Sequence, residues 1–263
     1  MRSQFFGCIV YYTALQMDSA TRIRAAIAEV FELRSAAHAN PALGVALTKV
    51  KELQALRFQG SYSALLNSPD FAEPSRFFLE ELYGIQDFSE RDAQFSRIAK
   101  SLSAIFPASV VSTAIDIAEL HALTEQLDVA VATHWLQLES TELTMTSSGY
   151  VSAWRQVGQR EARQKQLAMV LSLGSQLARL TRRPGLATLL KMMRHPAASA
   201  GLSSLQQFLE KGFSTFGKMA RKDNKAAEFL GLIQTKEMEW IASMYDESLS
   251  KQTRSLNGLL RTN

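Results

Sequence analysis

Residues 107–138 run without an internal glycine or proline, and this stretch constrains the fold more than any other. Pro107 suits the first turn of a helix, where its missing N–H is not needed. Apolar residues cover both flanks of the stretch at helical spacing, so we expect one long helix wrapped by neighbours. No sustained two-residue alternation and no Asn-Gly or Asp-Gly hairpin turn competes with helix. The sequence therefore predicts an all-α multi-helix bundle, with roughly eight helices around this long central helix.

Three ionisable residues of the central helix are expected to point into the protein. His121, Glu125 and Asp128 stand at i, i+4 and i+7, which places them on one face. The opposite face is the expected solvent side, and it carries Ser112, Asp116, Glu119, Gln126 and His134. Buried charge is costly unless it is paired and hydrogen-bonded. The three residues therefore need partners from other helices: an arginine, a water network, a metal or a ligand.

Glu81 and Arg91 are also expected to point inward, because each lies among aromatic residues of its own helix. We therefore expect one interior network that contains Glu81, Arg91, His121, Glu125 and Asp128. Our first interpretation is an ion-pair cluster that fixes how the helices pack. The alternative is a pocket between helices, in which His121 transfers a proton or binds a metal and Arg91 holds an anionic substrate.

No motif assigns a catalytic residue, a set of metal ligands or a cofactor. Glu-x-x-His is absent, and four histidines leave little material for a multi-histidine site. Phosphate-binding glycine loops and Gly-x-Ser-x-Gly are absent as well. The sequence leaves the cofactor unknown.

The other helices follow from apolar periodicity and from turn residues. Ser89-x-x-Asp92 resembles a capping box that opens the helix before the central one. The expected ranges are 19–38, 42–66, 71–83, 89–106, 150–181, 186–193, 203–216 and 224–245.

A polar segment at 140–149, rich in serine and threonine, is the expected boundary between two halves. We expect an acidic helical half at 17–142 and a basic helical half at 143–247 packed on it, within one domain or as two. Residues 1–16 are expected to be a disordered or misannotated N-terminal extension, and 248–263 a frayed tail.

Charge is spread unevenly along the chain. From 61 to 142 there are thirteen acidic and four basic residues, whereas from 143 to 222 there are thirteen basic and two acidic. Opposite charge favours packing of the two segments on each other. The alternative is an anion-binding surface, for which the candidates are Arg155, Arg160, Arg163, Arg182 and Arg183. Nucleic acid is the natural polyanion, although no helix-turn-helix pattern stands out.

Composition is typical of a globular protein, with 46% hydrophobic and 21% charged residues. A single cysteine, Cys8, excludes an intramolecular disulfide. The apolar run at 5–15 is too short to cross a bilayer, so we expect no membrane span. These features favour a cytoplasmic protein.

Three strings resemble a family of uncharacterised, mostly proteobacterial all-helical proteins: RFFLEELYG at 76–84, RDAQF at 91–95 and ELHAL at 119–123. The resemblance extends over about residues 20–245. That family has no established activity, so the resemblance implies a bacterial, cytoplasmic setting and no substrate, cofactor or catalytic residue.

Function is expected first to be non-enzymatic, through binding of a protein partner or self-assembly. One alternative is a helical protein or enzyme that binds a small ligand or metal in a pocket around His121, Glu125 and Asp128. Another alternative is nucleic-acid binding through the basic second half.

Overall fold

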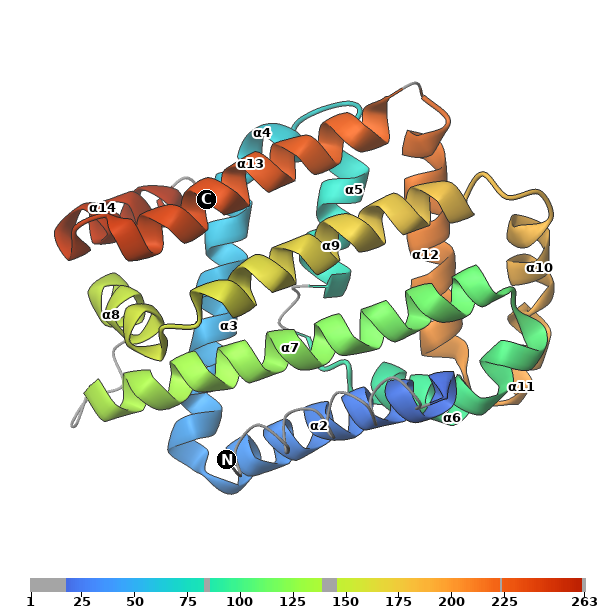
Figure 1. Cartoon of the computed structure of the whole chain (residues 1–263), viewed down its shortest axis with the longest axis horizontal. Helices are drawn as coiled ribbons and strands as arrows, with labels where there is room; N and C mark the ends of the chain where they lie inside the picture. Colours follow the sequence, from blue (N-terminus) through green and yellow to red (C-terminus); the bar gives the residue numbers. More distant parts are fainter. Residues whose placement is uncertain (1–17, 83–85, 139–145, 223, 262–263) are drawn as a thin grey trace, which may run out of the picture.

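The computed structural model describes residues 18–82, 86–138, 146–222 and 224–261 (Figure 1). Within these ranges the regular structure is helical throughout, as the sequence predicts. None of the helices in them is long and apolar enough to cross a membrane. The extension expected at 1–16 lies outside the described residues.

Four long helices lie side by side and form one layer of the molecule (Figure 1). In spatial order they are α2 (Ser19–Ala39), α7 (Ala108–Leu138), α9 (Arg160–Leu180) and α13 (Lys225–Asp246). Two further helices, α3 (Pro41–Ser61) and α12 (Ser203–Ala220), cross this layer. The predicted central helix is confirmed as α7, which packs on α2, α3, α8 and α9.

Shorter helices close the two ends of the layer. At one end, α8 (Ser147–Val157) and α14 (Leu249–Leu260) pack on each other, and α14 also packs on α3. At the other end, α12 is surrounded by α6 (Ser89–Ile105), α10 (Leu186–Met192) and α11 (Arg194–Ser199). Between α3 and α6 the chain forms α4 (Ser63–Leu66), α5 (Ala72–Phe77) and a π-helical turn, η1 (Phe78–Leu82).

The face of α7 that is expected to meet solvent is only partly exposed: Ser112 is exposed, whereas Asp116, Glu119, Gln126 and His134 are half-buried. Glu119 binds Arg22 of α2 at 2.6 Å, and Gln126 donates to Glu29 of the same helix. Asp116 accepts a hydrogen bond from a glutamine of α9. Polar residues on α7 therefore join it to both neighbours in the layer.

The described ranges contain more helices than the roughly eight predicted, because some predicted helices are broken. Gly158 adopts a left-handed φ of 66°, ends α8 and divides the helix expected over 150–181. Tyr62 separates α3 from α4 within the helix expected over 42–66. In both cases the apolar periodicity continues across the break, so the pattern alone did not reveal it.

Residues 249–260 form α14, where the sequence analysis expected a frayed tail. Ser248 caps this helix by accepting from the main-chain N–H of Lys251. Leu256 is fully buried in a core cluster shared with α3, α7 and α8. A Cβ at Gly60 would lie 2.3 Å from the carbonyl oxygen of Leu259, so the glycine permits the close approach of α3 and α14.

The acidic and basic segments pack on each other, in agreement with their opposite charge. Three lysines of α12 and the turn after it reach carboxylates of the α5 region. The pairs are Lys211 with Glu81 at 2.8 Å, Lys218 with Glu73 at 2.7 Å and Lys222 with Asp70 at 2.5 Å. Most of these side chains are exposed, so the pairs set orientation more than they add stability.

Candidate functional site

An apolar cavity of about 170 Å³ lies between α6, α7, α9, α10, α12 and the η1 region. Its walls are mostly Leu, Ile, Val, Phe and Ala side chains, among them Phe77, Phe95, Leu102, Ile117, Leu173 and Leu205. Protein interiors contain few voids larger than a water molecule. An engineered apolar cavity of about 150 Å³ binds benzene. This cavity is therefore large enough for a small apolar molecule.

Local backbone features give the cavity its shape. Gly212 of α12 lines it, and a Cβ at this position would lie 2.9 Å from Cζ of Phe77, so the glycine lets this ring pack against α12. The π-helical turn η1 follows α5 directly and begins with Phe78, whose side chain also lines the cavity. Single π turns are frequent at functional sites because they change the facing of successive side chains.

Three of the five residues predicted for the interior network line this cavity: Glu81, Arg91 and His121. The other two, Glu125 and Asp128, point into the protein, as expected from the helical spacing, and are 2% and 4% exposed. They lie beyond the cavity, further along α7. The structure thus places Glu81, Arg91 and His121 at the cavity wall, and Glu125 and Asp128 in the interior beyond it.

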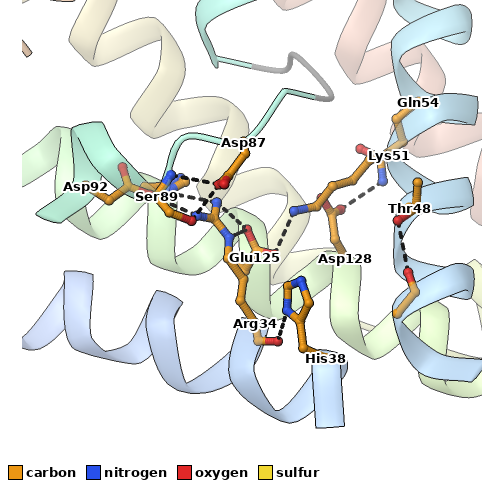
Figure 2. A network of polar contacts seen from close by, with 12 residues as sticks. Arg34, His38, Thr48, Lys51, Gln54, Asp87, Ser89, Asp92, Glu125 and Asp128 are labelled. Carbon is orange, nitrogen blue, oxygen red and sulfur yellow. Dashed lines mark hydrogen bonds and ion pairs between the residues drawn. The ribbon is translucent and has the colours of Figure 1, made fainter. Parts of the chain in front are cut away.

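That network is organised around Arg34 of α2 (Figure 2). Arg34 binds Oδ2 of Asp92 through Nη1 at 3.0 Å and Oε2 of Glu125 through Nη2 at 3.1 Å. His121 Nε2 lies 2.9 Å from the same Asp92 oxygen. Lys51 of α3 binds Oε1 of Glu125 at 2.7 Å. We call Arg34, Lys51, Asp92, His121 and Glu125 the buried polar network; it joins α2, α3, α6 and α7.

The two carboxyl groups of the network stay ionised despite their burial. Burial would raise the pKa of Glu125, but Lys51 and Arg34 outweigh it and lower the pKa below its ordinary value. Burial likewise opposes ionisation of Asp92, but His121 and Arg34 lower the pKa of its carboxyl. The ion pairs thus hold both groups as carboxylates.

Asp128 has the opposite balance. Burial raises its pKa above the ordinary value, and the nearby charge of Arg163 offsets this only in part. Gln54 donates to Oδ1 of Asp128 at 2.8 Å, whereas Arg163 Nη1 is 4.0 Å away. An amide donor and a distant guanidinium compensate less than the two close cations of Glu125.

Asp92 was predicted to close a capping box with Ser89, and this prediction is wrong. Asp92 is buried and accepts from Arg34 and His121, while Ser89 bonds to Asp87 through its main-chain N–H and its hydroxyl. The sequence carried a signal for this placement. Asp92 falls on one helical column with residues 88, 95, 99 and 102, which are all apolar.

Arg34 and Lys51 were also missed by the sequence analysis. Arg34 continues the buried column of Ile23, Ile27 and Val30 at the next helical step, and Lys51 follows Leu47 by four residues. A cation at such a position is usually explained by snorkelling to solvent. Only the tertiary fold shows that acidic residues of α6 and α7 meet it.

Arg91 lines the cavity and lies between two aromatic rings. Its guanidinium is 4.0 Å from the ring centre of Phe88 and 4.5 Å from that of Phe208. Nη1 donates to the carbonyl oxygen of Glu81 at 3.0 Å. The nearest carboxylate oxygens, of Glu81 and Asp92, are 3.7 and 4.0 Å from its nitrogens.

The five candidate anion-binding arginines are distributed among separate local contacts. Arg155 and Arg182 donate to main-chain carbonyls at the C-terminal ends of α13 and α12. Arg160 binds an aspartate at the end of α13 through both terminal nitrogens. Arg163 is buried and donates to a carbonyl of α7, and Arg183 is exposed in the turn after α9. Four of the five therefore have protein partners.

A second cavity, of about 60 Å³, shares Phe78 and Val170 with the first. Its lining is more polar and includes an ion pair of Arg57 with Glu237. A water molecule needs roughly 10–15 Å³ by this measure, so the space suits a few waters. The larger cavity is therefore the better ligand site. Within the described ranges, no group of three or more His, Cys, Asp or Glu side chains could hold a metal ion.

Comparison with known proteins gives one match. A family model described as Domain of unknown function (DUF8198) matches residues 33–251. No curated protein and no solved structure matches the chain. The matched range contains every residue of the buried polar network and most of the cavity wall.

Proposed function

The chain belongs to the DUF8198 family, and we propose that it binds a small apolar molecule in the cavity between α6, α7, α9 and α12. The observation that carries this proposal is a cavity of about 170 Å³ with a mostly apolar lining. Small-molecule sites are typically concave and apolar, with a few placed polar groups. This cavity has that character, with Arg91, Asp92 and His121 as polar lining residues.

Apolar space between helices favours a bound molecule energetically. Apolar side chains that face unfilled space lack contact partners there, and this costs free energy. A ligand that fills the space regains much of that free energy through contact with the walls. The cavity favours ligand binding over the binding of a protein partner, which is the first expectation from the sequence.

The buried polar network supports binding in a second way. It ties α2, α3, α6 and α7 together through Arg34 and Lys51, at the polar side of the cavity. Walls that are fixed before the ligand arrives lose less conformational entropy when it binds. The first interpretation of the network, as a cluster that fixes helix packing, is thus compatible with a ligand site beside it.

Calorimetric titration of the full chain with octan-1-ol tests the proposal. Leu173 lines the cavity on α9 and is 6% exposed. The Leu173→Phe variant should bind octan-1-ol at least tenfold more weakly, because the larger ring occupies the cavity. It should cost less than ~1 kcal/mol of unfolding free energy, since the ring enters existing space.

Leu127→Phe is the matched control. Leu127 is fully buried on α7 and lines neither cavity. The same substitution there should cost ~1–3 kcal/mol by overpacking and leave the affinity for octan-1-ol unchanged. Failure of the wild-type chain to bind octan-1-ol, or equal affinities in wild type and Leu173→Phe, would overturn the proposed function.

A further inference from the structure

The charged and titratable lining residues gather at one end of the large cavity. Arg91 and Asp92 at the start of α6 and His121 near the middle of α7 line one end. Val110 near the start of α7 and Leu186 of α10 line the other end. Val110 and His121 are separated on one helix by roughly 16 Å, at 1.5 Å per residue. A molecule that fits this space has a polar head and an apolar tail along α7.

Arg91 differs from Arg34 of the buried polar network in its distance from the neighbouring carboxylates. Its nitrogens are 3.7 Å from a carboxylate oxygen of Glu81 and 4.0 Å from one of Asp92, which is beyond hydrogen-bond distance. Arg34, in contrast, binds its two carboxylates at 3.0 and 3.1 Å. Among the described residues, the hydrogen-bond acceptor of Arg91 is the main-chain carbonyl of Glu81. Its remaining N–H groups can therefore serve an incoming acceptor.

The two carboxylates beside Arg91 are bound by other cations. Asp92 accepts from Arg34 at 3.0 Å, and Glu81 Oε1 lies 2.8 Å from Nζ of Lys211. Each acidic group is thus neutralised without Arg91. An anion that approaches Arg91 meets a guanidinium whose charge is only loosely compensated.

Aromatic stacking fixes the orientation of this guanidinium. Phe88 and Phe208 approach the Arg91 guanidinium within 4.5 Å, and Phe208 also lines the cavity. A stacked guanidinium keeps its edge N–H groups for a planar partner, and a carboxylate matches them with two parallel hydrogen bonds.

We infer that the ligand is an amphipathic acid, whose carboxylate binds Arg91 and whose aliphatic chain extends toward α10. A cavity of about 150 Å³ holds the six carbons of benzene, so this cavity suits a chain of about six to eight carbons. The inference rests on the proposed function and adds the charge and length of the ligand.

Titration of the full chain with three eight-carbon compounds tests the inference. Octanoate, octan-1-ol and octylamine share the chain and differ in the charge of the head group. At pH 7, octanoate should bind about tenfold more tightly than octan-1-ol, and octylamine should bind most weakly. This comparison uses the unaltered protein and so does not depend on the folding of any variant.

Two arginine variants assign the effect to one residue. Arg91→Gln should lower the affinity for octanoate about tenfold, and much more than the affinity for octan-1-ol, so that the preference for octanoate is lost. Arg97 lies on the same helix, is exposed and donates to the carbonyl of Gly201. The control Arg97→Gln should change neither affinity.

The outcomes separate the two proposals. Equal affinity for octanoate and octan-1-ol, a preference for octylamine, or unchanged octanoate binding by Arg91→Gln overturns the inference and leaves the proposed function standing. Failure of the wild-type chain to bind octan-1-ol overturns both, because the inference rests on the proposed function.

Discussion

Two buried carboxyl groups on α7, those of Glu125 and Asp128, show how neighbouring residues decide the effect of burial. Glu125 is hydrogen-bonded to Arg34 and Lys51, and their charges lower its pKa despite burial. Asp128 is hydrogen-bonded to the amide of Gln54, and burial raises its pKa. Ionisation of Glu125 therefore stabilises the fold, whereas ionisation of Asp128 opposes it.

We expect Glu125→Gln and Asp128→Asn to change stability with opposite dependence on pH. Ionised Glu125 stabilises the fold above its ordinary pKa of 4.5, and this contribution is lost as pH falls through its lower folded-state pKa. The Glu125→Gln variant should therefore be less stable than wild type by ~1–3 kcal/mol at pH 7, and the difference should narrow below about pH 4.5.

For Asp128 the sign is reversed. Its folded-state pKa lies above 3.8, so wild type loses stability relative to Asp128→Asn as pH rises through the interval above that value. Urea denaturation of both variants between pH 3 and pH 7 measures the two differences. Parallel pH dependence of the two variants would show that the ion pairs of Glu125 do not act as described.

At the residue scale, helical spacing on α7 predicted the inward direction of His121, Glu125 and Asp128 correctly. The partners of these residues could not be predicted in the same way. Arg34 and Lys51 lie on other helices, and nothing in one sequence states which helices become neighbours. Asp92 fits a local capping pattern as well as an apolar helical column, and in the fold the column decides its position.

At the element scale, the strength of a local signal decided what could be predicted. Helix α7 was found because 31 residues carry no breaker. The division at Gly158 was missed because an isolated glycine is tolerated within many helices, and only its φ of 66° reveals a helix end. Helix α14 was missed because its polar sequence becomes stable only when Leu256 is buried against α3 and α8.

The buried contact of α14 gives a prediction at this scale. Leu256→Ala should cost ~2–5 kcal/mol of unfolding free energy, because Leu256 is fully buried. Leu249→Ala, in the same helix but 41% exposed, should change it by less than ~0.5 kcal/mol. Urea denaturation measures both. Equal, small effects would mean that α14 behaves as the frayed tail expected from the sequence.

At the scale of the whole molecule, the opposite charges of the two segments indicated that they would pack on each other. Glu81, Arg91 and His121 indicated a pocket between helices as an alternative, but its apolar wall could not be predicted, because it comes from α6, α7, α9, α10, α12 and η1, far apart in sequence. Each apolar lining residue has the pattern of an ordinary core residue. Only the complete packing shows that these side chains leave about 170 Å³ between them.

The position of a bound ligand tests the central claim most directly. In 8-bromooctanoate the bromine marks the end of the chain that is remote from the carboxylate. Crystals of the full chain with this compound should give an anomalous bromine peak inside the cavity near Leu186 of α10, with the carboxylate on Arg91. A bromine peak outside the cavity, or none at saturating ligand, would contradict the claim that this cavity is the binding site.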